Sequence, residues 1–199
     1  MKVTVKDLSF SYDAKMIIQN LSFDFDDERP LCVLGPSGQG KTTLLRLLAG
    51  LETPTKGTIE GITKDTTISV LFQEDRLFPH LTVRDNWKIV SSKITEEMIL
   101  AMAKALDLEE EDLNKRPRDL SGGMRRRCAI GRCLLFPADM VFMDEPFQGL
   151  DEATRDKVME TIKKRTHKRP FLMITHDEKD VEGLSAKVLR LEDPVETQK

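Results

Sequence analysis

Short runs of consecutive apolar residues divide the chain into alternating elements. Four runs, with one serine among them, have this character: 31–34, 68–72, 140–143 and 171–174. Such runs are typical of strands that are buried on both faces of a parallel sheet. After the first run, apolar residues recur at helical spacing from Leu44 to Leu51, with Gly50 as a helix stop. The pattern therefore predicts an α/β core on a mostly parallel sheet.

The N-terminal part of the chain follows a shorter period. Residues 3–5 and 21–25 alternate between apolar and polar side chains, which is the pattern of half-buried strands. A turn near Asp13 would join these strands into a small antiparallel layer. We expect a further short strand at 58–62, after turns at Pro54 and Gly57.

The middle of the chain is predicted to be helical. From Gln73 to about Arg118, helical patterns are separated by breakers such as Pro79 and Pro117, and Thr95 is a good N-cap for one helix. The acidic run 109–112 is interpreted as solvated rather than as a metal site. Residues 73–135 are therefore expected to form an inserted helical subdomain, while 1–72 and 136–199 form the core of a single domain.

Composition limits the possible functions. The 199 residues are enough for one sizeable core, and 33% are charged with a net charge of −3, which argues against nucleic-acid binding that rests on overall charge. We expect no leader and no membrane span, because no apolar run is long enough. The cysteines are odd in number and are expected to be buried and reduced, as in a reducing compartment: Cys32, Cys128 and Cys133.

The first apolar run is followed by a glycine-rich loop that fits the phosphate-binding pattern G-x-x-x-x-G-K-[ST]. Its glycines let successive backbone N–H groups and the positive end of the next helix converge on phosphate oxygens. Lys41 would add a charge at the β- and γ-phosphates, and the Thr42 hydroxyl would be a ligand for Mg²⁺. The loop comprises Gly35, Pro36, Ser37, Gly38, Gln39, Gly40, Lys41 and Thr42, with Thr43 behind it.

A second turn suited to an anion lies at Leu120-Ser121-Gly122-Gly123, ahead of a helical run that ends at Leu135. Ser121 can cap this helix, and the glycines expose backbone N–H groups. The arginines at 125–127 would oppose the helix dipole unless acidic groups or phosphate compensate, although a solvated basic face would explain them alone.

Two later strands end in polar side chains. The run 140–143 leads into Asp144 and Glu145, and the run 171–174 leads toward His176. Ligands bind at the carboxyl ends of such strands, so Asp144 could hold Mg²⁺ and Glu145 could polarise an attacking water. A strand terminus and a structural histidine are the alternatives. Tyr12 could stack on adenine, although a partly exposed strand residue explains it as well.

In this order the motifs resemble the nucleotide-binding subunit of ATP-binding-cassette (ABC) transporters over almost the whole chain. The resemblance implies a phosphate-loop (RecA-like) α/β fold with ATP and Mg²⁺ as cofactors. It makes residues 35–43 the Walker A loop, with Lys41 catalytic, and Ser121, Gly122 and Gly123 the signature turn. It further makes Tyr12 the adenine-stacking aromatic, Gln73 the Q-loop residue near Mg²⁺ and the attacking water, and Asp144 the Walker B aspartate. By the same resemblance Glu145 is the catalytic carboxylate, Asp151 the D-loop residue and His176 the switch histidine.

The resemblance also implies partners. In this family two subunits meet head to tail around ATP, and a transmembrane permease docks on the helical insertion, here near 76–78. A peripheral position on the cytoplasmic face of the membrane follows, with an extracytoplasmic solute-binding protein reached through the permease. Nucleic acid is not expected.

Details of the motifs select within the family. Met124 and the segment 73–83 look like the nitrate, sulfonate and taurine importer group, whereas Gln148-Gly149 departs from the commoner Ser-Ala before the D-loop. An importer subunit is therefore expected, with an exporter subunit or a soluble cassette ATPase as alternatives. A nucleotide kinase would lack the turn at 120–123. No room for a C-terminal regulatory domain is expected after residue 191.

Overall fold

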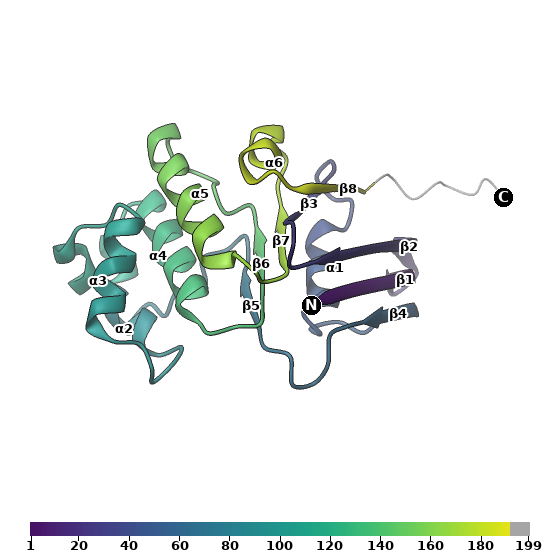
Figure 1. Ribbon diagram of the computed structural model, residues 1–199, viewed down its shortest axis with the longest axis horizontal. Helices are drawn as coiled ribbons and strands as arrows, with labels where there is room; N and C mark the ends of the chain where they lie inside the picture. Colours follow the sequence, from purple (N-terminus) through teal and green to yellow (C-terminus); the bar gives the residue numbers. More distant parts are fainter. Residues whose placement is uncertain (192–199) are drawn as a thin grey trace.

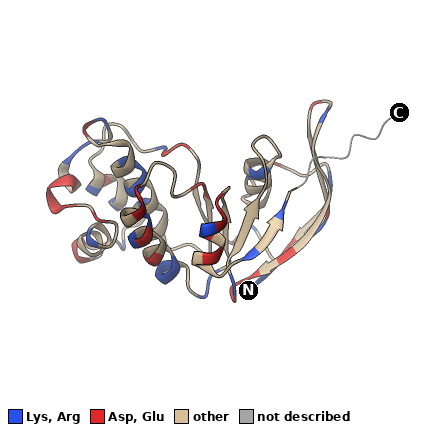
Figure 2. Ribbon diagram, turned by 90° about the horizontal axis from the view of Figure 1, so that it is seen from above, with Lys and Arg blue, Asp and Glu red and all other residues tan. Residues whose placement is uncertain are grey.

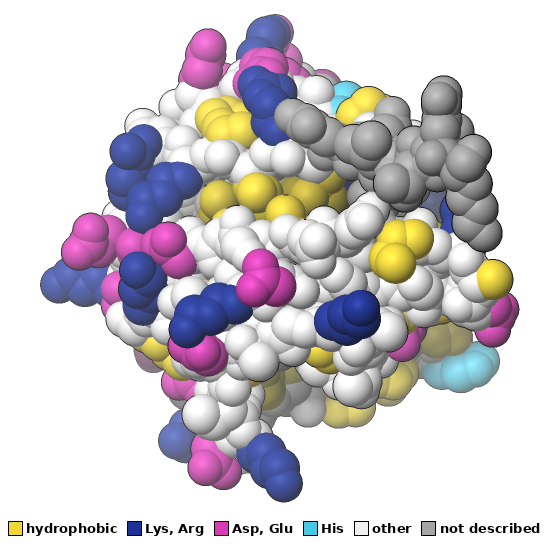
Figure 3. Space-filling view, turned by 90° about the vertical axis from the view of Figure 1, so that its right-hand side faces the viewer, with side chains coloured by type: hydrophobic (Ala, Val, Ile, Leu, Met, Phe, Trp, Pro, Cys, Tyr) yellow, Lys and Arg dark blue, Asp and Glu magenta, His cyan; other side chains and the backbone are white. Residues whose placement is uncertain are grey.

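The computed structural model describes residues 1–191, so the end of the predicted core segment 136–199 lies outside the described residues. The two N-terminal strands form the predicted antiparallel layer, and a later strand, β4, joins it in the order β2-β1-β4. These strands are β1 (Lys2–Tyr12), β2 (Lys15–Asp26) and β4 (Lys56–Glu60). Figure 3 shows basic and acidic side chains interspersed on this end of the molecule. Between β1 and β4, Lys6 Nζ and Glu60 Oε1 form an ion pair at 2.8 Å.

The second sheet is the predicted parallel core. Its order is β5-β6-β7-β3-β8, and every neighbouring pair is parallel. The strands are β3 (Leu31–Leu34), β5 (Ile68–Leu71), β6 (Met140–Asp144), β7 (Phe171–Ile174) and β8 (Lys187–Arg190). Residues of β3, β6 and β7 are all buried, as expected for strands covered on both faces. The predicted α/β fold class is confirmed.

Helices cover both faces of this sheet (Figure 1). Helix α1 lies between the two sheets, where its leucines pack with apolar residues of β1 and β6. The other helices gather on the opposite side, and Figure 2 shows both charge signs distributed over them. The helices are α1 (Lys41–Leu48), α2 (Val83–Lys88), α3 (Glu96–Ala105), α4 (Gly122–Leu135), α5 (Glu152–Thr166) and α6 (Glu178–Leu184), with 3₁₀ turns η1 (Glu110–Asn114) and η2 (Pro117–Asp119).

The predicted helix caps are present. Thr95 accepts a hydrogen bond from the Met98 N–H at 3.3 Å at the start of α3. At the end of α1, Gly50 has φ 69° and its N–H bonds to the Leu47 carbonyl, while the Leu51 N–H bonds to the Arg46 carbonyl. This is the Schellman arrangement that ends a helix. The spacing of Leu51 predicted that it would continue the apolar stripe of the helix. That prediction is wrong, because Leu51 lies beyond the helix end and is 52% exposed.

Two sequence expectations about smaller features also have an outcome. The three cysteines are free and buried, as predicted. Burial raises the pKa of the Cys32 thiol to about 12.

Strand β4 ends at Glu60, two positions before the predicted end, and Gly61 follows with φ 90°. A Cβ at Gly61 would lie 2.1 Å from the Lys2 carbonyl oxygen, so only glycine lets the chain leave the sheet there.

Candidate nucleotide site

A cavity of about 440 Å³ opens at the carboxyl ends of β3, β6 and β7. Its lining includes most of the glycine-rich loop together with polar residues that follow the other two strands. The lining residues are Ile17, Gly35, Pro36, Ser37, Gly38, Gly40, Lys41, Thr42, Thr43, Gln73, Asp144, Glu145, Gln148 and His176. The structure thus brings together residues that are far apart in the sequence and that were predicted separately.

The glycine-rich loop joins β3 to α1 in a conformation that needs its glycines. Gly38 and Gly40 have φ 86° and 82°, in the left-handed region that favours glycine. A Cβ at Gly38 would meet no protein atom within 4 Å, so the backbone there is open to an approaching ligand. The first residues of α1, Lys41 to Thr43, also line the cavity, and the N–H groups of a helix's first turn have no partner within the helix. Backbone N–H groups and a helix N-terminus together form an anion-binding site.

Lys41 provides the positive charge of this loop. Its Nζ donates to the carbonyl oxygens of Gly35 at 2.6 Å and Pro36 at 2.8 Å. These bonds fold the side chain back over its own loop. Phosphate oxygens in the cavity would compete with the two carbonyls for the ammonium group, because charge-assisted hydrogen bonds are the stronger ones.

Thr42 and Asp144 meet across the cavity. The Thr42 hydroxyl donates to Asp144 Oδ2 at 2.6 Å. Asp144 ends β6, whereas Thr42 lies at the start of α1, which follows β3, and β7 lies between β3 and β6 in the sheet. Burial raises the pKa of the Asp144 carboxyl, and the Thr42 hydrogen bond acts in the opposite direction. A hydroxyl and a carboxylate oxygen this close are the hard ligands that Mg²⁺ prefers. The donor set therefore fits Mg²⁺.

Glu145 faces the same cavity because its backbone leaves the strand geometry. Its φ is 48°, which is unfavourable for a residue with a Cβ, and its N–H still bonds to the Ile174 carbonyl of β7 at 2.9 Å. Successive strand residues point to opposite faces, so this left-handed turn lets Asp144 and Glu145 share one crevice. The predicted placement of the two carboxylates is what the structure has.

His176 is paired with Glu145. Its Nδ1 lies 2.9 Å from both carboxylate oxygens of Glu145. This hydrogen bond, followed by the negative charge of the same carboxylate, raises the pKa of His176. The loop that carries the histidine is anchored on α5, because Arg155 Nη2 contacts Asp177 Oδ2 and Asp180 Oδ1, both at 2.5 Å. The His176 side chain is otherwise exposed to solvent, with 74% of its surface accessible.

Some residues of the predicted site do not line this cavity. Tyr12 is 43% exposed at the end of β1, packs edge-on against Phe10 at 4.8 Å between ring centres, and donates to Glu52 Oε1 at 3.3 Å. Gln39 is buried within its loop. Asp151 is the N-cap of α5, and the hydrogen bond from the Thr154 N–H lowers its pKa.

The predicted signature turn is also away from the cavity. Ser121 caps α4 by accepting from the Met124 N–H at 3.2 Å. Ser121 and Gly122 are exposed, and a Cβ at Gly122 would meet only the end of the Arg125 side chain at 3.9 Å. The turn therefore presents open backbone at the protein surface, as the motif predicted, but to solvent rather than to the chain's own phosphate loop.

Sequence reasoning missed part of the site. Ile17 and Gln148 line the cavity without having been assigned a site role, and Ile17 carries no polar signal that could have indicated it. Gln148 follows Glu145 by three positions, so its place in the same loop could have been inferred. A solvated basic face does not explain Arg126, which is only 4% exposed, whereas Arg125 and Arg127 are partly exposed.

The fold and the site define a phosphate-loop nucleotide-binding protein. The family model described as "ABC transporter" matches residues 18–148. The chain therefore belongs to the ABC transporter family, and the predicted family is confirmed.

Individual relatives agree with this assignment. The chain is 36% identical to the aliphatic sulfonates import ATP-binding protein SsuB 1 of Rhodococcus jostii (strain RHA1), over 92% of this chain and 76% of that protein. It is 29% identical to the ergothioneine transport ATP-binding protein EgtV of Helicobacter pylori (strain G27), over 95% and 96% of the respective chains. The predicted resemblance to a group that includes sulfonate importers is confirmed.

Other relatives are longer. The chain spans 54% of the xylose/arabinose import ATP-binding protein XacJ of Haloferax volcanii (strain ATCC 29605), to which it is 30% identical over 96% of its own length. Among solved structures, the ATP-binding cassette MJ0796 as a dimer bound to ADP and Pi superposes with a TM-score of 0.83 at 26% identity, covering 96% of this chain and 94% of that one. Within residues 1–191, no helix has the length and apolar character needed to cross a membrane.

Proposed function

We propose that this chain is the energy-coupling subunit of a small-solute importer and hydrolyses ATP to drive it. The observation that carries the proposal is the convergence of Lys41, Thr42, Asp144, Glu145 and His176 on one cavity. The names of several relatives, which are import ATP-binding proteins, support the direction of transport. The cavity offers groups that would bind a phosphate and a metal ion. We therefore propose that the permease, and not this chain, selects the solute.

The loop at 35–43 would bind the triphosphate. Its backbone N–H groups and the N-terminus of α1 would hold the β- and γ-phosphates, and Lys41 would exchange its two carbonyl partners for phosphate oxygens. Thr42 and Asp144, with Gln73 at the cavity edge, would hold Mg²⁺. When bound, Mg²⁺ would neutralise charge that develops on the phosphates.

Glu145 and His176 would act on the reacting groups. The Glu145 carboxylate would orient the attacking water and accept its proton, and Gln73 would help to place that water. In this structure, His176 Nδ1 lies 2.9 Å from Glu145 Oε1. With ATP bound, its exposed ring could turn to the γ-phosphate and leave the carboxylate to the water. We propose these roles for Lys41, Gln73, Glu145 and His176.

The test compares the unmodified protein with a Glu145→Gln variant. We expect Mg²⁺-dependent release of phosphate from ATP, and a loss of at least about 100-fold in kcat in the variant, because the amide cannot accept the proton. ATP binding should be retained, since the phosphate loop is unchanged. Unmodified protein that releases phosphate no faster than the variant, with or without a permease, would refute the proposed activity.

We further propose that ATP joins two copies of the chain head to tail. The turn at 121–123, in which Ser121 and Gly122 are exposed, lies outside the cavity of its own chain, so it is available to meet the γ-phosphate held by a second copy. Asp151, exposed at the start of α5, is proposed to contact ATP at the same interface. The dimeric cassette MJ0796, whose structure superposes on this chain, supports this arrangement.

A mixing experiment tests the composite site. Lys41→Ala would inactivate the phosphate loop, and Ser121→Glu would place a negative charge where the partner's phosphate should sit. Each variant alone should be inactive. In a mixture, the heterodimer keeps one site built from an intact loop and an intact turn, so activity should return toward a quarter of the unmodified rate. If each site lay within one chain, the mixture would stay inactive.

Tyr12 is proposed to stack on the adenine ring. The open part of its ring, at 43% exposure, gives a flat surface beside the loop-bearing core. Tyr12→Ala is expected to raise the Kd for ATP about tenfold, the value of one aromatic contact of about 1–1.5 kcal/mol. An unchanged Kd would leave Tyr12 as a surface residue of β1.

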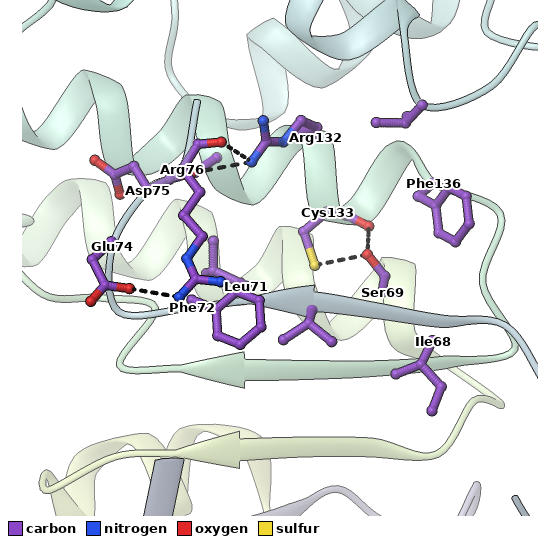
Figure 4. Close-up of a pocket in the computed structure, with 13 residues that line it drawn as sticks. Ile68, Ser69, Leu71, Phe72, Glu74, Asp75, Arg76, Arg132, Cys133 and Phe136 are labelled. Carbon is purple, nitrogen blue, oxygen red and sulfur yellow. Dashed lines mark hydrogen bonds and ion pairs between the residues drawn. The ribbon is translucent and has the colours of Figure 1, made fainter. Parts of the chain in front are cut away.

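The docking site for a permease is proposed on the helical segment 73–135. A second cavity, of about 230 Å³, lies between the edge strand β5 and α4 (Figure 4). At its rim the Arg76 guanidinium stacks over the Phe72 ring at 3.8 Å, and Phe78 is 49% exposed nearby in sequence. Docking here would hold the chain on the inner face of the cell membrane, with a solute-binding protein engaged only through the permease.

Phe78→Glu should abolish co-purification with the permease while the ATPase activity of the isolated chain is kept.

The direction of transport is tested in vesicles that contain the permease. If the chain serves an importer, labelled solute moves toward the side that holds ATP and this chain. An exporter subunit would drive solute away from that side. Recovery of the chain with ribosomes or DNA instead of membranes would favour a soluble cassette ATPase.

A further inference from the structure

A single buried arginine on α4 joins two loops of the candidate site. Arg126 is 4% exposed, in the first turns of the helix that follows the signature turn. Its guanidinium donates to main-chain carbonyl oxygens in the loop after β5, at the last residue of β6 and in the loop that follows β6. These oxygens belong to Phe72, Gln73, Asp144, Glu145 and Pro146.

The geometry divides the donors of Arg126 between the two loops. Nη1 donates to Phe72 O at 2.8 Å and Gln73 O at 3.1 Å. Nη2 donates to Asp144 O at 2.5 Å and Glu145 O at 2.9 Å. A planar guanidinium has fixed donor directions, so it holds the two loops at one relative position in a way that a flexible ammonium group would not.

The loop after β6 has a particular need for such a contact. Glu145 has φ 48°, a conformation that residues with a Cβ seldom adopt without support. Its carbonyl accepts from Arg126 and from the Gln148 N–H at 3.2 Å. The direction of the Glu145 carboxylate follows from this backbone conformation, and it is the Arg126 contact that ties the conformation to α4.

A purely structural role would need only that the buried charge be neutralised. Asp75 Oδ1, at 3.2 Å, is the acidic partner of Arg126, and Asp75 belongs to the loop after β5. The carbonyl oxygens of Asp144 and Glu145 carry no formal charge, so they do not neutralise the guanidinium. Arg126 nevertheless donates hydrogen bonds to them at 2.5 Å and 2.9 Å. The arrangement is therefore directed at the backbone of the candidate catalytic loop.

We infer that Arg126 is a positioning residue, which fixes the backbone of Glu145 against that of Gln73 and makes the water-polarising carboxylate move with α4. The inference rests on the proposed ATPase function. Because α4 starts at the turn proposed to meet a second copy, closure of that turn on ATP would be transmitted through Arg126 to Glu145.

The experiment uses the full chain with Arg126→Lys and Arg126→Met. We expect kcat for ATP hydrolysis to fall about 10- to 100-fold in both, with KM and the Kd for ATP within about threefold, since Arg126 does not line the cavity. Rates are normalised to the ATP-binding sites found by titration, so loss of folded protein is not counted as loss of kcat. A change in KM with kcat unchanged would overturn the inference.

Arg132→Met is the matched control. Arg132 lies on the same helix, and its Nη2 donates to the carbonyls of Asp75 at 3.2 Å and Arg76 at 2.8 Å, as Figure 4 shows. Within residues 1–191, its hydrogen bonds go to Asn86 and the loop after β5, and none goes to the loop after β6. This variant is expected to lower Tm while kcat stays within about twofold. An equal loss of kcat in Arg126→Met and Arg132→Met would mean that any weakening of α4 is sufficient.

A double variant separates positioning from stability. If Arg126 acts through Glu145, the Arg126→Lys change should cost less than about twofold in a Glu145→Gln background, measured by single-turnover release of labelled phosphate. Full additivity of the two losses would overturn the inference. Absence of hydrolysis by the unmodified protein is a different result, which refutes the proposed function itself.

Discussion

The contact between Gly131 and Trp87 gives the most direct test of packing beneath the signature helix. Gly131 lies within α4, and a Cβ added there would meet Trp87 Cζ2 at 2.5 Å, Trp87 Cε2 at 2.7 Å and Leu106 Cδ1 at 3.0 Å. The indole is fully buried, and its Nε1 donates to the Cys128 carbonyl at 2.8 Å, so it has little freedom to move away.

Two opposing effects decide the result of Gly131→Ala. Alanine favours a helix interior over glycine by about 1 kcal/mol. Overpacking in a core typically costs about 1–3 kcal/mol, and contacts with an anchored ring fall toward the upper end. We therefore expect a net loss of about 1–2 kcal/mol in the free energy of unfolding, or about 3–6 °C in Tm for a domain of this size.

The assay is urea unfolding followed by circular dichroism without nucleotide, because Trp87 is the only tryptophan and its fluorescence disappears in one of the variants. In a Trp87→Phe background the smaller ring no longer reaches the new methyl group. Gly131→Ala should then become stabilising by up to about 1 kcal/mol. Gly183→Ala is the control, since its Cβ would meet the flexible end of Met159 at 3.1 Å. A stabilising Gly131→Ala in the unmodified background would refute the packing argument.

The remaining predictions concern ionisation and reactivity. In an NMR titration, the raised pKa of His176 should fall toward its usual value in Glu145→Gln, and the stability that this pair contributes should be lost as pH rises through that raised pKa. An unchanged pKa would exclude Glu145 as the cause. Because burial raises the pKa of the Asp144 carboxyl, Asp144→Asn should raise the Tm of the nucleotide-free protein by about 2–4 °C at neutral pH, and the gain should vanish in acid; a lower Tm would contradict this. A thiol reagent should modify the cysteines only after unfolding, since burial raises the pKa of Cys128 to about 12 and of Cys133 to about 11; rapid labelling of the folded chain would show that they are accessible.

Much of the fold follows from local patterns in the sequence. Apolar runs predicted the buried strands, and Ser121 and Thr95 predicted two helix starts, because a cap depends on neighbouring residues only. The end of α1 was less clear from spacing alone. Leu51 has the spacing of a core residue, yet Gly50 ends the helix before it.

The site was predictable where a motif fixes the backbone. The loop at 35–43 and the pair at 144–145 were placed correctly at one cavity, because strand, turn and helix follow one another directly. Arg126 was not distinguished from its neighbours Arg125 and Arg127, although Ile130 and Cys133 continue its buried stripe along α4. Its carbonyl partners come from segments more than 15 positions away, and a contact of that kind is set by tertiary packing rather than by local pattern.

The position of β7 has a consequence for the order in which the molecule can mature. This strand lies between β3 and β6 (Figure 1), and it is the only element that pairs with both among the described residues. The 2.6 Å bond between Thr42 and Asp144 spans the gap that β7 fills. A nascent polypeptide that has emerged from the ribosome only as far as Asp144 already carries both halves of the phosphate and metal site, but it lacks the spacer that sets their separation. ATP affinity should therefore arise late in synthesis, in one step, once residues 171–174 have been added.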